Sequence, residues 1–332
     1  MRFSFRLLVV LAVTALFVHR LKFTAFNSHS AENGRKILSP EPQQQQQQIY
    51  QDTKEDARCL IKKADILYTF QRILNSELLV SPYPHAIITD FFSPKIYKCI
   101  LRNLKNMRTQ IFLRKINSRM SPKEIEQARR SYNELNTPSH LERLEQIYDL
   151  KKESKMFWQT FPAIMNNEGV RNNLLKKFQG PLLLRAPRFE FLIKPQTFSR
   201  QLLSIDGSSY AIRPHTDTVD KLVTILIYLP EDRETFHQLG TLLLQRKNLA
   251  HSLNISGKQR AEWEDFNVVK QAPFEPNVAL AFSACDESWH AVKEVEKMKT
   301  ARISLQTFIM KKNTKGEGIK ERVGSCARTI EK

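Results

Sequence analysis

The chain has 332 residues, enough for one large domain or two modest domains with a hydrophobic core. Its 52 Lys and Arg residues outnumber its 34 Asp and Glu residues, which gives a formal net charge of +18. The basic residues show neither zinc-finger spacing nor an RNA-binding signature, so no nucleic-acid partner is expected; solvated helix faces account for most of the charge, and an acidic partner stays open.

The first 23 residues are typical of a targeting segment, either a signal anchor or a signal peptide. The uncharged apolar run Leu7–Val18 has the length of a signal-peptide core and is shorter than the roughly 20 residues of a spanning helix. Basic residues follow it without a clear cleavage site, which favours a single-pass anchor facing the ER or Golgi lumen. The sequon Asn254-Ile255-Ser256 fits this secretory location. The lack of acidic residues before Glu32 leaves a mitochondrial presequence as the alternative.

Residues 24–56 are poor in apolar side chains and include an uninterrupted glutamine run, Gln43–Gln48. Such a composition cannot bury enough apolar surface to fold, so we expect a disordered stem. The globular part is expected to begin near Ala57. A catalytic domain tethered by a flexible stem would have this organisation.

Residues 57–181 are expected to form the helical part of the catalytic domain. Apolar residues have helical spacing over Arg58–Leu79, and alternation over Ala86–Thr89 predicts a strand. Ser93-Pro94 is a suitable start for the next helix. The charged segment Ser121–Lys177 carries an apolar stripe at helical spacing, and such a stripe is far more often core than a binding groove.

Short strands are predicted over residues 182–312, and a basic tail, 313–332, follows. The predicted strands are Leu182–Leu184, Arg188–Ile193, Gln201–Ile205, Leu222–Leu229, Thr241–Gln245, Val278–Phe282 and Ala301–Met310. This pattern predicts an α+β protein in which a β-sandwich or barrel carries the preceding helices on the outer face of one sheet. There is no glycine-rich phosphate loop or nucleophile elbow.

The four cysteines, Cys59, Cys99, Cys285 and Cys326, include no close pair. Their number rules out a disulfide-stapled scaffold and neither demands nor excludes one disulfide. We expect Cys285 to be a small buried apolar residue. His85 lies beside a predicted strand start, where a histidine is more often structural than functional, and it is given no role.

A candidate metal site begins with His215 and Asp217, which precede the strand Leu222–Leu229. On an extended backbone, residues two positions apart point the same way, so this imidazole and this carboxylate would lie side by side. His290 follows a predicted buried strand and turn, and it supplies a third candidate ligand. Two imidazoles and one carboxylate leave three metal positions open, which suits non-haem Fe(II). Each residue alone would be an ordinary polar residue; the ordered set favours a metal site.

The beginning of the last predicted strand adds a candidate carboxylate-binding pair. Arg302 can hold a carboxylate through two hydrogen bonds. Ser304 is two positions further, so it points to the same face and can donate another hydrogen bond.

These motifs, in this order, resemble the Fe(II)- and 2-oxoglutarate-dependent oxygenases, and within them the prolyl-hydroxylase-like group. The stretches that fit are Tyr83-Pro84-His85-Ala86-Ile87-Ile88-Thr89-Asp90-Phe91-Phe92, Pro214-His215-Thr216-Asp217, Tyr228-Leu229-Pro230, Gly240-Thr241, Pro276-Asn277 and Ser288-Trp289-His290-Ala291-Val292. The resemblance covers roughly Leu182–Met310. It implies a double-stranded β-helix, or jelly-roll, core over residues 182–312.

The resemblance also implies roles for the candidate residues. His215, Asp217 and His290 would be Fe(II) ligands, Arg302 would anchor the distal carboxylate of 2-oxoglutarate, and Ser304 would assist it. The implied reaction hydroxylates a substrate C–H bond and releases succinate and CO2. A prolyl residue in a protein is the first substrate that the resemblance suggests, and ascorbate is an additional cofactor that it admits.

Three features leave details of the site open. The group often places a tyrosine on the strand after the aspartate, in contact with 2-oxoglutarate; here Ile227 is predicted at that position, with Tyr228 on the opposite face. The segment Gly207–His215 is slightly longer than usual, which affects the strand register. The long, partly polar segment His237–Lys270 is a lid candidate.

Two other functions remain as alternatives. One is a non-catalytic binding protein on the same scaffold, although the complete ligand set argues against a decayed site. The other is a membrane-tethered glycosyltransferase, suggested by the anchor and the stem. It would need an acidic metal–nucleotide motif, for which Asp217-Thr218-Val219-Asp220 is a poor candidate, because histidine ligands indicate a softer metal than manganese.

Overall fold

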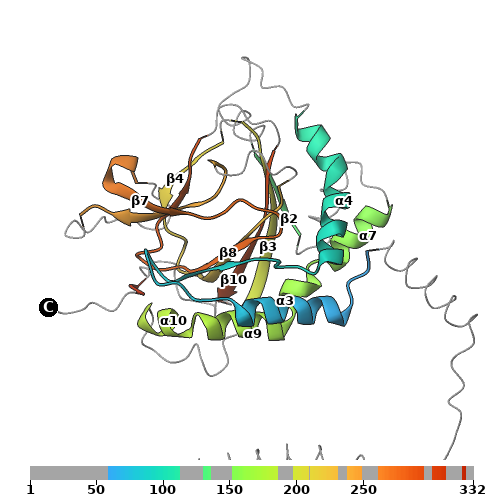
Figure 1. The fold of residues 1–332 in the computed structure, drawn as a ribbon, viewed down its shortest axis with the longest axis horizontal. Helices are drawn as coiled ribbons and strands as arrows, with labels where there is room; N and C mark the ends of the chain where they lie inside the picture. The colour runs from blue at the N-terminus through green and yellow to red at the C-terminus, as the bar shows by residue number, and fades with distance from the viewer. Residues whose placement is uncertain are drawn as a thin grey trace, which may run out of the picture. The chain divides into compact units, whose positions relative to one another are not determined.

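Two antiparallel sheets form the centre of the fold in the computed structural model (Figure 1). The large sheet has the strand order β1-β8-β5-β10-β3-β2, with β1 (His85–Ile88), β2 (Arg130–Glu134), β3 (Thr197–Asp206), β5 (Lys221–Tyr228), β8 (Ala279–Ser283) and β10 (Arg302–Lys311). The small sheet has the order β4-β9-β6-β7, with β4 (Ile212–His215), β6 (Leu242–Arg246), β7 (Phe266–Gln271) and β9 (His290–Val292).

The strand order is that of a double-stranded β-helix. From β3 onward the chain passes back and forth between the sheets, so that β3, β5, β8 and β10 lie in the large sheet and β4, β6, β7 and β9 lie in the small sheet. Neighbours within a sheet are therefore distant in sequence, as where β10 pairs with both β3 and β5. The structure confirms the prediction of an α+β protein with a jelly-roll core.

The structure describes residues 59–112, 130–135, 152–185, 197–208, 210–230, 238–248, 261–294, 301–311 and 324–326. The predicted targeting segment and stem, most of the basic tail, the sequon at Asn254 and the predicted strand Arg188–Ile193 lie outside these ranges. Within them, no helix combines the length and the hydropathy that a membrane span needs.

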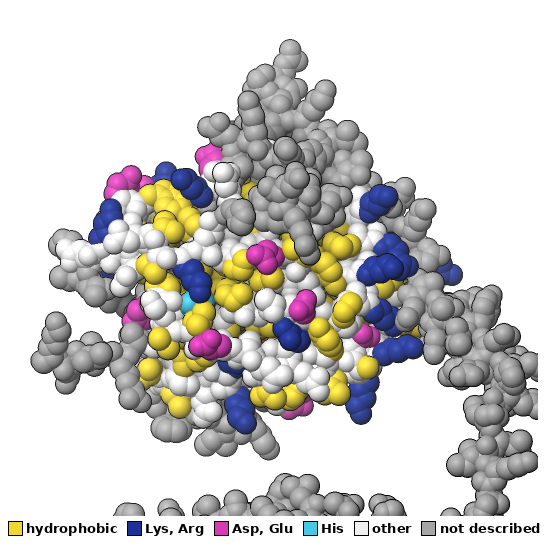
Figure 2. Space-filling view, viewed as in Figure 1, with side chains coloured by type: hydrophobic (Ala, Val, Ile, Leu, Met, Phe, Trp, Pro, Cys, Tyr) yellow, Lys and Arg dark blue, Asp and Glu magenta, His cyan; other side chains and the backbone are white. Residues whose placement is uncertain are grey.

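Helices cover the outer face of the large sheet, as predicted. They are α3 (Lys63–Asn75), α4 (Pro94–Phe112), α7 (Lys152–Thr160), α8 (Ala163–Asn166), α9 (Glu168–Lys177) and α10 (Gln179–Arg185). One hydrophobic core joins Trp158 and Leu174 of the helices to Ile225 of the sheet. Figure 1 shows α3, α9 and α10 running along one side of the sheets. On the face shown in Figure 2, Lys and Arg side chains are most frequent on the side of α4 and α7.

Two predictions of secondary structure are wrong. Leu182–Leu184, predicted as a strand, lies within α10, because a short apolar run fits a buried strand and a buried helix equally well. Arg130–Glu134, within the segment predicted as helical, forms β2 at the edge of the large sheet, where it pairs with β3. An edge strand depends on its partner more than on its own periodicity, which explains why its sequence did not indicate it.

Alternate residues of β5 face opposite sides of the large sheet. Ile225 and Ile227 pack into the core that the sheet shares with the helices. Leu226 and Tyr228 pack into a second core, which includes residues of both sheets and so lies between them. The prediction that Ile227 takes the inner position is therefore wrong, and Tyr228 takes it. A register error of one residue reverses the face of every side chain in a strand.

Two disulfides join the four cysteines. Cys59–Cys99 ties the segment before α3 to α4, and Cys285–Cys326 ties the loop between β8 and β9 to the short segment 324–326. Cys285 is buried, as predicted, but the expectation that it acts as a small apolar residue is wrong. Its partner lies 41 residues away in sequence, and spacing alone does not reveal such a pair.

Candidate metal centre

The side chains of His215, Asp217 and His290 converge where β4 pairs with β9. In this pairing His215 lies opposite His290, and Asp217 follows in the loop between β4 and β5. Each residue offers one ligand atom, and these atoms lie within 4.8 Å of one another. The two imidazole ring centres are 4.2 Å apart. The structure thus brings together the three residues that the sequence singled out.

Hydrogen bonds to main-chain carbonyls orient both imidazole rings. Nδ1 of His215 lies 2.9 Å from the carbonyl oxygen of Arg213, and Nδ1 of His290 lies 2.9 Å from that of Ser288. A carbonyl oxygen only accepts, so each Nδ1 carries the proton and each Nε2 has a free lone pair. Burial lowers the pKa of His215 to about 3 and also lowers the pKa of His290. Both rings are therefore neutral near pH 7, the form that binds a metal.

Two side chains hold the Asp217 carboxylate. Nζ of Lys221 lies 2.5 Å from Oδ1, and the hydroxyl group of Thr224 donates to Oδ2. Burial opposes ionisation, but Lys221, His290 and His215 together outweigh it and keep the pKa of Asp217 well below its usual value. Lys221 also lies over the ring of Phe308, 3.8 Å from its centre. Sequence reasoning missed both partners, although Thr224 could have been found from its place on the inner face of β5.

Arg302 lies on the inner face of β10, where a buried carboxylate already binds it. Its Nη1 donates to Oδ2 of Asp206 over 2.8 Å, and its Nε donates to the carbonyl oxygen of Leu239 over 2.7 Å. Its Nη2 lies 3.5 Å from Oγ1 of Thr241. A guanidinium group has five N–H donors, so two remain after these three contacts. The sequence did not reveal Asp206, which is 96 residues from Arg302.

Tyr228 and Thr241 complete the surroundings of Arg302. The guanidinium carbon lies 5.9 Å from the centre of the Tyr228 ring, and the Tyr228 hydroxyl donates to Oγ1 of Thr241 over 2.9 Å. Gly240, just before β6, lies against the segment that follows β7, because a Cβ there would lie 1.9 Å from the carbonyl oxygen of Ala272. Tyr228 is therefore in the region where the family resemblance places a tyrosine.

The interior of the jelly roll fits a small dicarboxylate beside a metal. The hydroxyl group of Ser304 is buried and has no hydrogen-bond partner among the described residues, so it and the remaining donors of Arg302 can bind a carboxylate. The small sheet gives the distance between the two halves of the site. Leu243 pairs with His290, and Thr241, two residues before Leu243, contacts Arg302. Two strand residues span about 7 Å, the scale of a five-carbon diacid.

Arg185 connects the loop that carries Asp217 to the loop that leads to His290. Its guanidinium group donates to the carbonyl oxygens of Lys221 and Ala284, each over 2.7 Å, and to that of Val219. Val219 and Lys221 follow Asp217, and Ala284 is the first residue of the loop that leads to His290. Sequence reasoning missed Arg185, because it lies at the end of α10, far from both loops in sequence.

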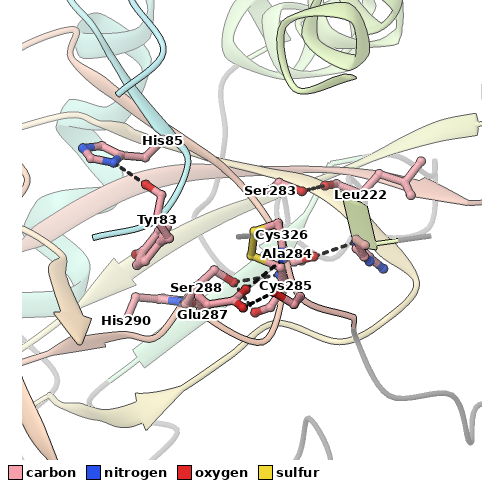
Figure 3. The surroundings of a disulfide bond; sticks show 12 residues. Tyr83, His85, Leu222, Ser283, Ala284, Cys285, Glu287, Ser288, His290 and Cys326 are labelled. Atoms are coloured by element: carbon pink, nitrogen blue, oxygen red, sulfur yellow. Dashed lines mark hydrogen bonds between the residues drawn. A yellow bond between two sulfur atoms is a disulfide. The ribbon is translucent and has the colours of Figure 1, made fainter. Parts of the chain in front are cut away.

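The loop before His290 is also attached to the segment 324–326 (Figure 3). Besides the Cys285–Cys326 disulfide, the Glu287 carboxylate accepts hydrogen bonds from the main-chain N–H of Cys326, over 2.9 Å, and from the hydroxyl of Ser325. Glu287 lies near both sulfur atoms, but these cysteines are bonded to each other and offer no thiolate ligand. This cluster therefore supports the loop.

The lid prediction for His237–Lys270 is wrong for the described residues. β6 and most of β7 lie in this segment, and they pair with each other in the small sheet. The residues between them, 249–260, lie outside the described ranges. Both strands were hard to predict as a pair, because their pairing shifts register between Leu243 and Leu244.

Several solved structures of other proteins are similar in fold to this chain. No protein-family model and no curated protein matches this sequence. A prolyl hydroxylase from Trichoplax adhaerens, in complex with a peptide fragment of the hypoxia-inducible factor oxygen degradation domain, has a TM-score of 0.41 and 13% identity, covering 76% of this chain and 95% of that chain. A dioxygenase for auxin oxidation from Arabidopsis thaliana, in complex with 2-oxoglutarate, has a TM-score of 0.38 and 12% identity. The match covers 76% of this chain and 91% of the dioxygenase. A prolyl-4-hydroxylase from Pseudomonas putida has a TM-score of 0.30 and 13% identity. The match covers 56% of this chain and 89% of the hydroxylase.

These TM-scores lie below 0.5, so the jelly-roll assignment rests on the strand order of the sheets. The similarities decide neither the reaction nor the substrate.

Proposed function

We propose that this protein is an Fe(II)- and 2-oxoglutarate-dependent oxygenase that hydroxylates a C–H bond of its substrate. The proposal is based on the position of two groups of side chains in the interior of the jelly roll. Two neutral imidazoles and a carboxylate, with ligand atoms within 4.8 Å of one another, share the interior of a jelly roll with a buried arginine and a buried serine hydroxyl that has no partner in the described part of the chain. A divalent metal suits the first group, and a carboxylate suits the second.

Each side chain then has a defined task. Nε2 of His215, Nε2 of His290 and one oxygen of Asp217 would hold iron, with the Nδ1 hydrogen bonds keeping both rings in place. Arg302 and Ser304 would bind the distal carboxylate of 2-oxoglutarate. The bound iron would supply the activation of O2, and the enclosed apolar walls would keep bulk water from the reacting atoms.

The proposed reaction converts a substrate C–H bond, O2 and 2-oxoglutarate into C–OH, succinate and CO2. One oxygen atom enters the hydroxyl group, and the other enters succinate. We propose a prolyl residue in a protein as the substrate, on the basis of the sequence resemblance alone. Ascorbate would act as an auxiliary reductant that keeps the iron in its Fe(II) state.

Two disulfides support a location in an oxidising compartment. Such bonds persist in the secretory pathway and are rare in reducing compartments. Together with the predicted anchor over residues 1–23, they support a membrane-anchored protein whose catalytic domain faces the ER or Golgi lumen. Protease protection in microsomes and glycosidase sensitivity at Asn254 would distinguish this location from the mitochondrion.

The proposed function is tested by binding and turnover measured separately. The protein should bind Fe(II) and then 2-oxoglutarate under anaerobic conditions, and it should release succinate once air is admitted. His215→Ala and Asp217→Ala should abolish iron binding, because each removes one of three protein ligands. Iron binding without succinate release, in the presence of lysate as a source of substrate, would favour the non-catalytic alternative. Absence of iron binding would exclude the oxygenase.

A further inference from the structure

The hydroxyl group of Tyr83 is buried and has no hydrogen-bond partner among the described residues. Tyr83 directly precedes Pro84 and β1, and it is 1% exposed. Its ring packs in the core between the sheets, with Phe282 of the large sheet and Leu243 of the small sheet. The hydroxyl thus lies inside the jelly roll, on the same side of the large sheet as the metal centre.

The surrounding residues fix the Tyr83 main chain. Pro82 and Pro84 flank it, and a proline restricts both its own φ angle and the conformation of the residue before it. Nδ1 of His85 donates to the carbonyl oxygen of Tyr83 over 2.8 Å, and the two rings meet edge to face with centres 6.0 Å apart. His85, for which no role was predicted, therefore holds Tyr83 in position.

Tyr83 is one aromatic ring away from a metal-binding histidine. The ring of Phe282 contacts the ring of Tyr83, with centres 5.9 Å apart, and the ring of His290, with centres 4.8 Å apart. Figure 3 shows the Tyr83 side chain directed from the β1 region toward the segment that carries His290. Burial raises the pKa of Tyr83 well above its ordinary value, and the neighbouring Tyr228 and Asp217 raise it further. The phenol keeps its proton and can only act as a neutral hydrogen-bond donor or acceptor.

A phenylalanine would fill the same space without burying an unpaired polar group. Burying a hydroxyl group without a partner destabilises a protein, so native interiors rarely contain one. A donor in this position suits an acceptor that arrives with a ligand. The oxo-acid end of 2-oxoglutarate carries three oxygen atoms, and under the proposed function this end lies at the metal.

We propose that the Tyr83 hydroxyl donates a hydrogen bond to an oxygen atom at the oxo-acid end of 2-oxoglutarate. This inference rests on the proposed function and deepens it. The co-substrate is then held at both ends: Arg302 and Ser304 bind the distal carboxylate, and Tyr83 binds the end at the metal. Tyr83 selects 2-oxo acids by hydrogen bonding, separately from the affinity for the metal itself.

The experiment compares full-length wild-type protein with Tyr83→Phe, using Mn(II) in place of Fe(II) so that no turnover occurs. Calorimetry gives the affinity for Mn(II) and then the affinity for 2-oxoglutarate. Tyr83→Phe should bind 2-oxoglutarate about tenfold more weakly, the size expected for one hydrogen bond to a charged group, and should bind Mn(II) unchanged. The matched control is Tyr97→Phe, which removes a buried tyrosine hydroxyl from α4, on the helical side of the large sheet.

Thermal unfolding provides a second readout that a purely structural role would not produce. Without ligand, Tyr83→Phe should have the same Tm as the wild type or a higher one, because the hydroxyl makes no hydrogen bond to any residue that the structure describes. With 2-oxoglutarate, the rise in Tm should be smaller than in the wild type. Equal 2-oxoglutarate affinities of wild type and Tyr83→Phe would overturn the inference and leave the proposed function intact. A wild type that binds metal but no 2-oxoglutarate would overturn both.

Discussion

The guanidinium group of Arg185, at the end of α10, donates a 2.7 Å hydrogen bond to the main-chain carbonyl oxygen of Ala284. Ala284 begins the loop that leads to β9. The same group binds the carbonyl oxygens of Val219 and Lys221. One side chain from the helical layer therefore sets the distance between the loop that follows Asp217 and the loop that leads to His290.

Arg185→Gln is expected to weaken metal binding about tenfold, because a shorter neutral side chain cannot reach three carbonyl oxygens and supporting contacts of this kind change metal affinity by about 10–100-fold. Arg185→Lys should behave similarly, since an ammonium group lacks the planar fork of a guanidinium. Titration with Mn(II) measures the effect. Arg72→Gln is the matched control, because Arg72 also binds a main-chain carbonyl, that of Thr89, but on α3. An equal loss in both variants would contradict the specific role of Arg185.

Lys221→Met should strengthen metal binding. The Lys221 ammonium lies 2.5 Å from Oδ1 of Asp217, so it competes with a cation for that oxygen and repels a divalent ion nearby. By Coulomb's law, the repulsion between an ammonium group and a divalent ion about 4 Å away is at least about 1 kcal/mol even in water. Removing this repulsion is expected to increase the Mn(II) affinity about tenfold. The metal-free variant should unfold at a lower temperature, because the Asp217 carboxylate loses its cationic partner and keeps only the hydrogen bond from Thr224. Unchanged or weaker metal binding would show that Lys221 supports the site instead of competing for it.

Arg302→Gln should abolish measurable 2-oxoglutarate binding and leave metal binding in place. It should also destabilise the protein by about 3–5 kcal/mol, because it leaves the carboxylate of Asp206 buried without its cation. The double variant Arg302→Gln/Asp206→Asn separates the two effects. Chemical denaturation should show recovered stability, whereas calorimetry should still show no 2-oxoglutarate binding. Recovery of both would mean that Arg302 is purely a structural partner of Asp206.

The Cys285–Cys326 disulfide should matter to metal binding, and the Cys59–Cys99 disulfide should not. Replacing either pair by serines is expected to cost about 2–5 kcal/mol of stability. Only the Cys285→Ser/Cys326→Ser variant should also bind Mn(II) more weakly, because that bond supports the loop before His290. The comparison is made at a temperature where both variants are folded. Equal metal affinity in the two variants would argue against the predicted coupling.

The convergence of the three candidate metal ligands could be predicted from the sequence because their geometry is largely local. His215 and Asp217 are two residues apart, and a strand pairing fixes His290 opposite His215. The jelly roll was predicted through the order of the motifs, while β4, β7 and β9 were not predicted as strands. Such short strands are stabilised by their neighbours in the sheet more than by their own side chains.

Contacts between residues that are far apart in the chain could not be predicted from the sequence. Asp206 meets Arg302 because β3 pairs with β10, and Arg185 reaches the metal loops from a helix that was predicted partly as strand. The inner position of Tyr228 depended on strand register, which a one-residue error reverses. The unpaired hydroxyl group of Tyr83 has no sequence signal, since an aromatic residue in an apolar stretch indicates packing alone.

The Cys285–Cys326 bond also closes residues 285–326 into a covalent loop that contains β9 and β10. His290, Arg302 and Ser304 are all part of this loop. A single proteolytic cut between Cys285 and Cys326 would leave both fragments joined, and on a non-reducing gel the nicked protein would migrate as one species. The candidate metal ligand His290 and the candidate carboxylate-binding residue Arg302 would stay on one connected molecule after such damage, until a reductant breaks the disulfide.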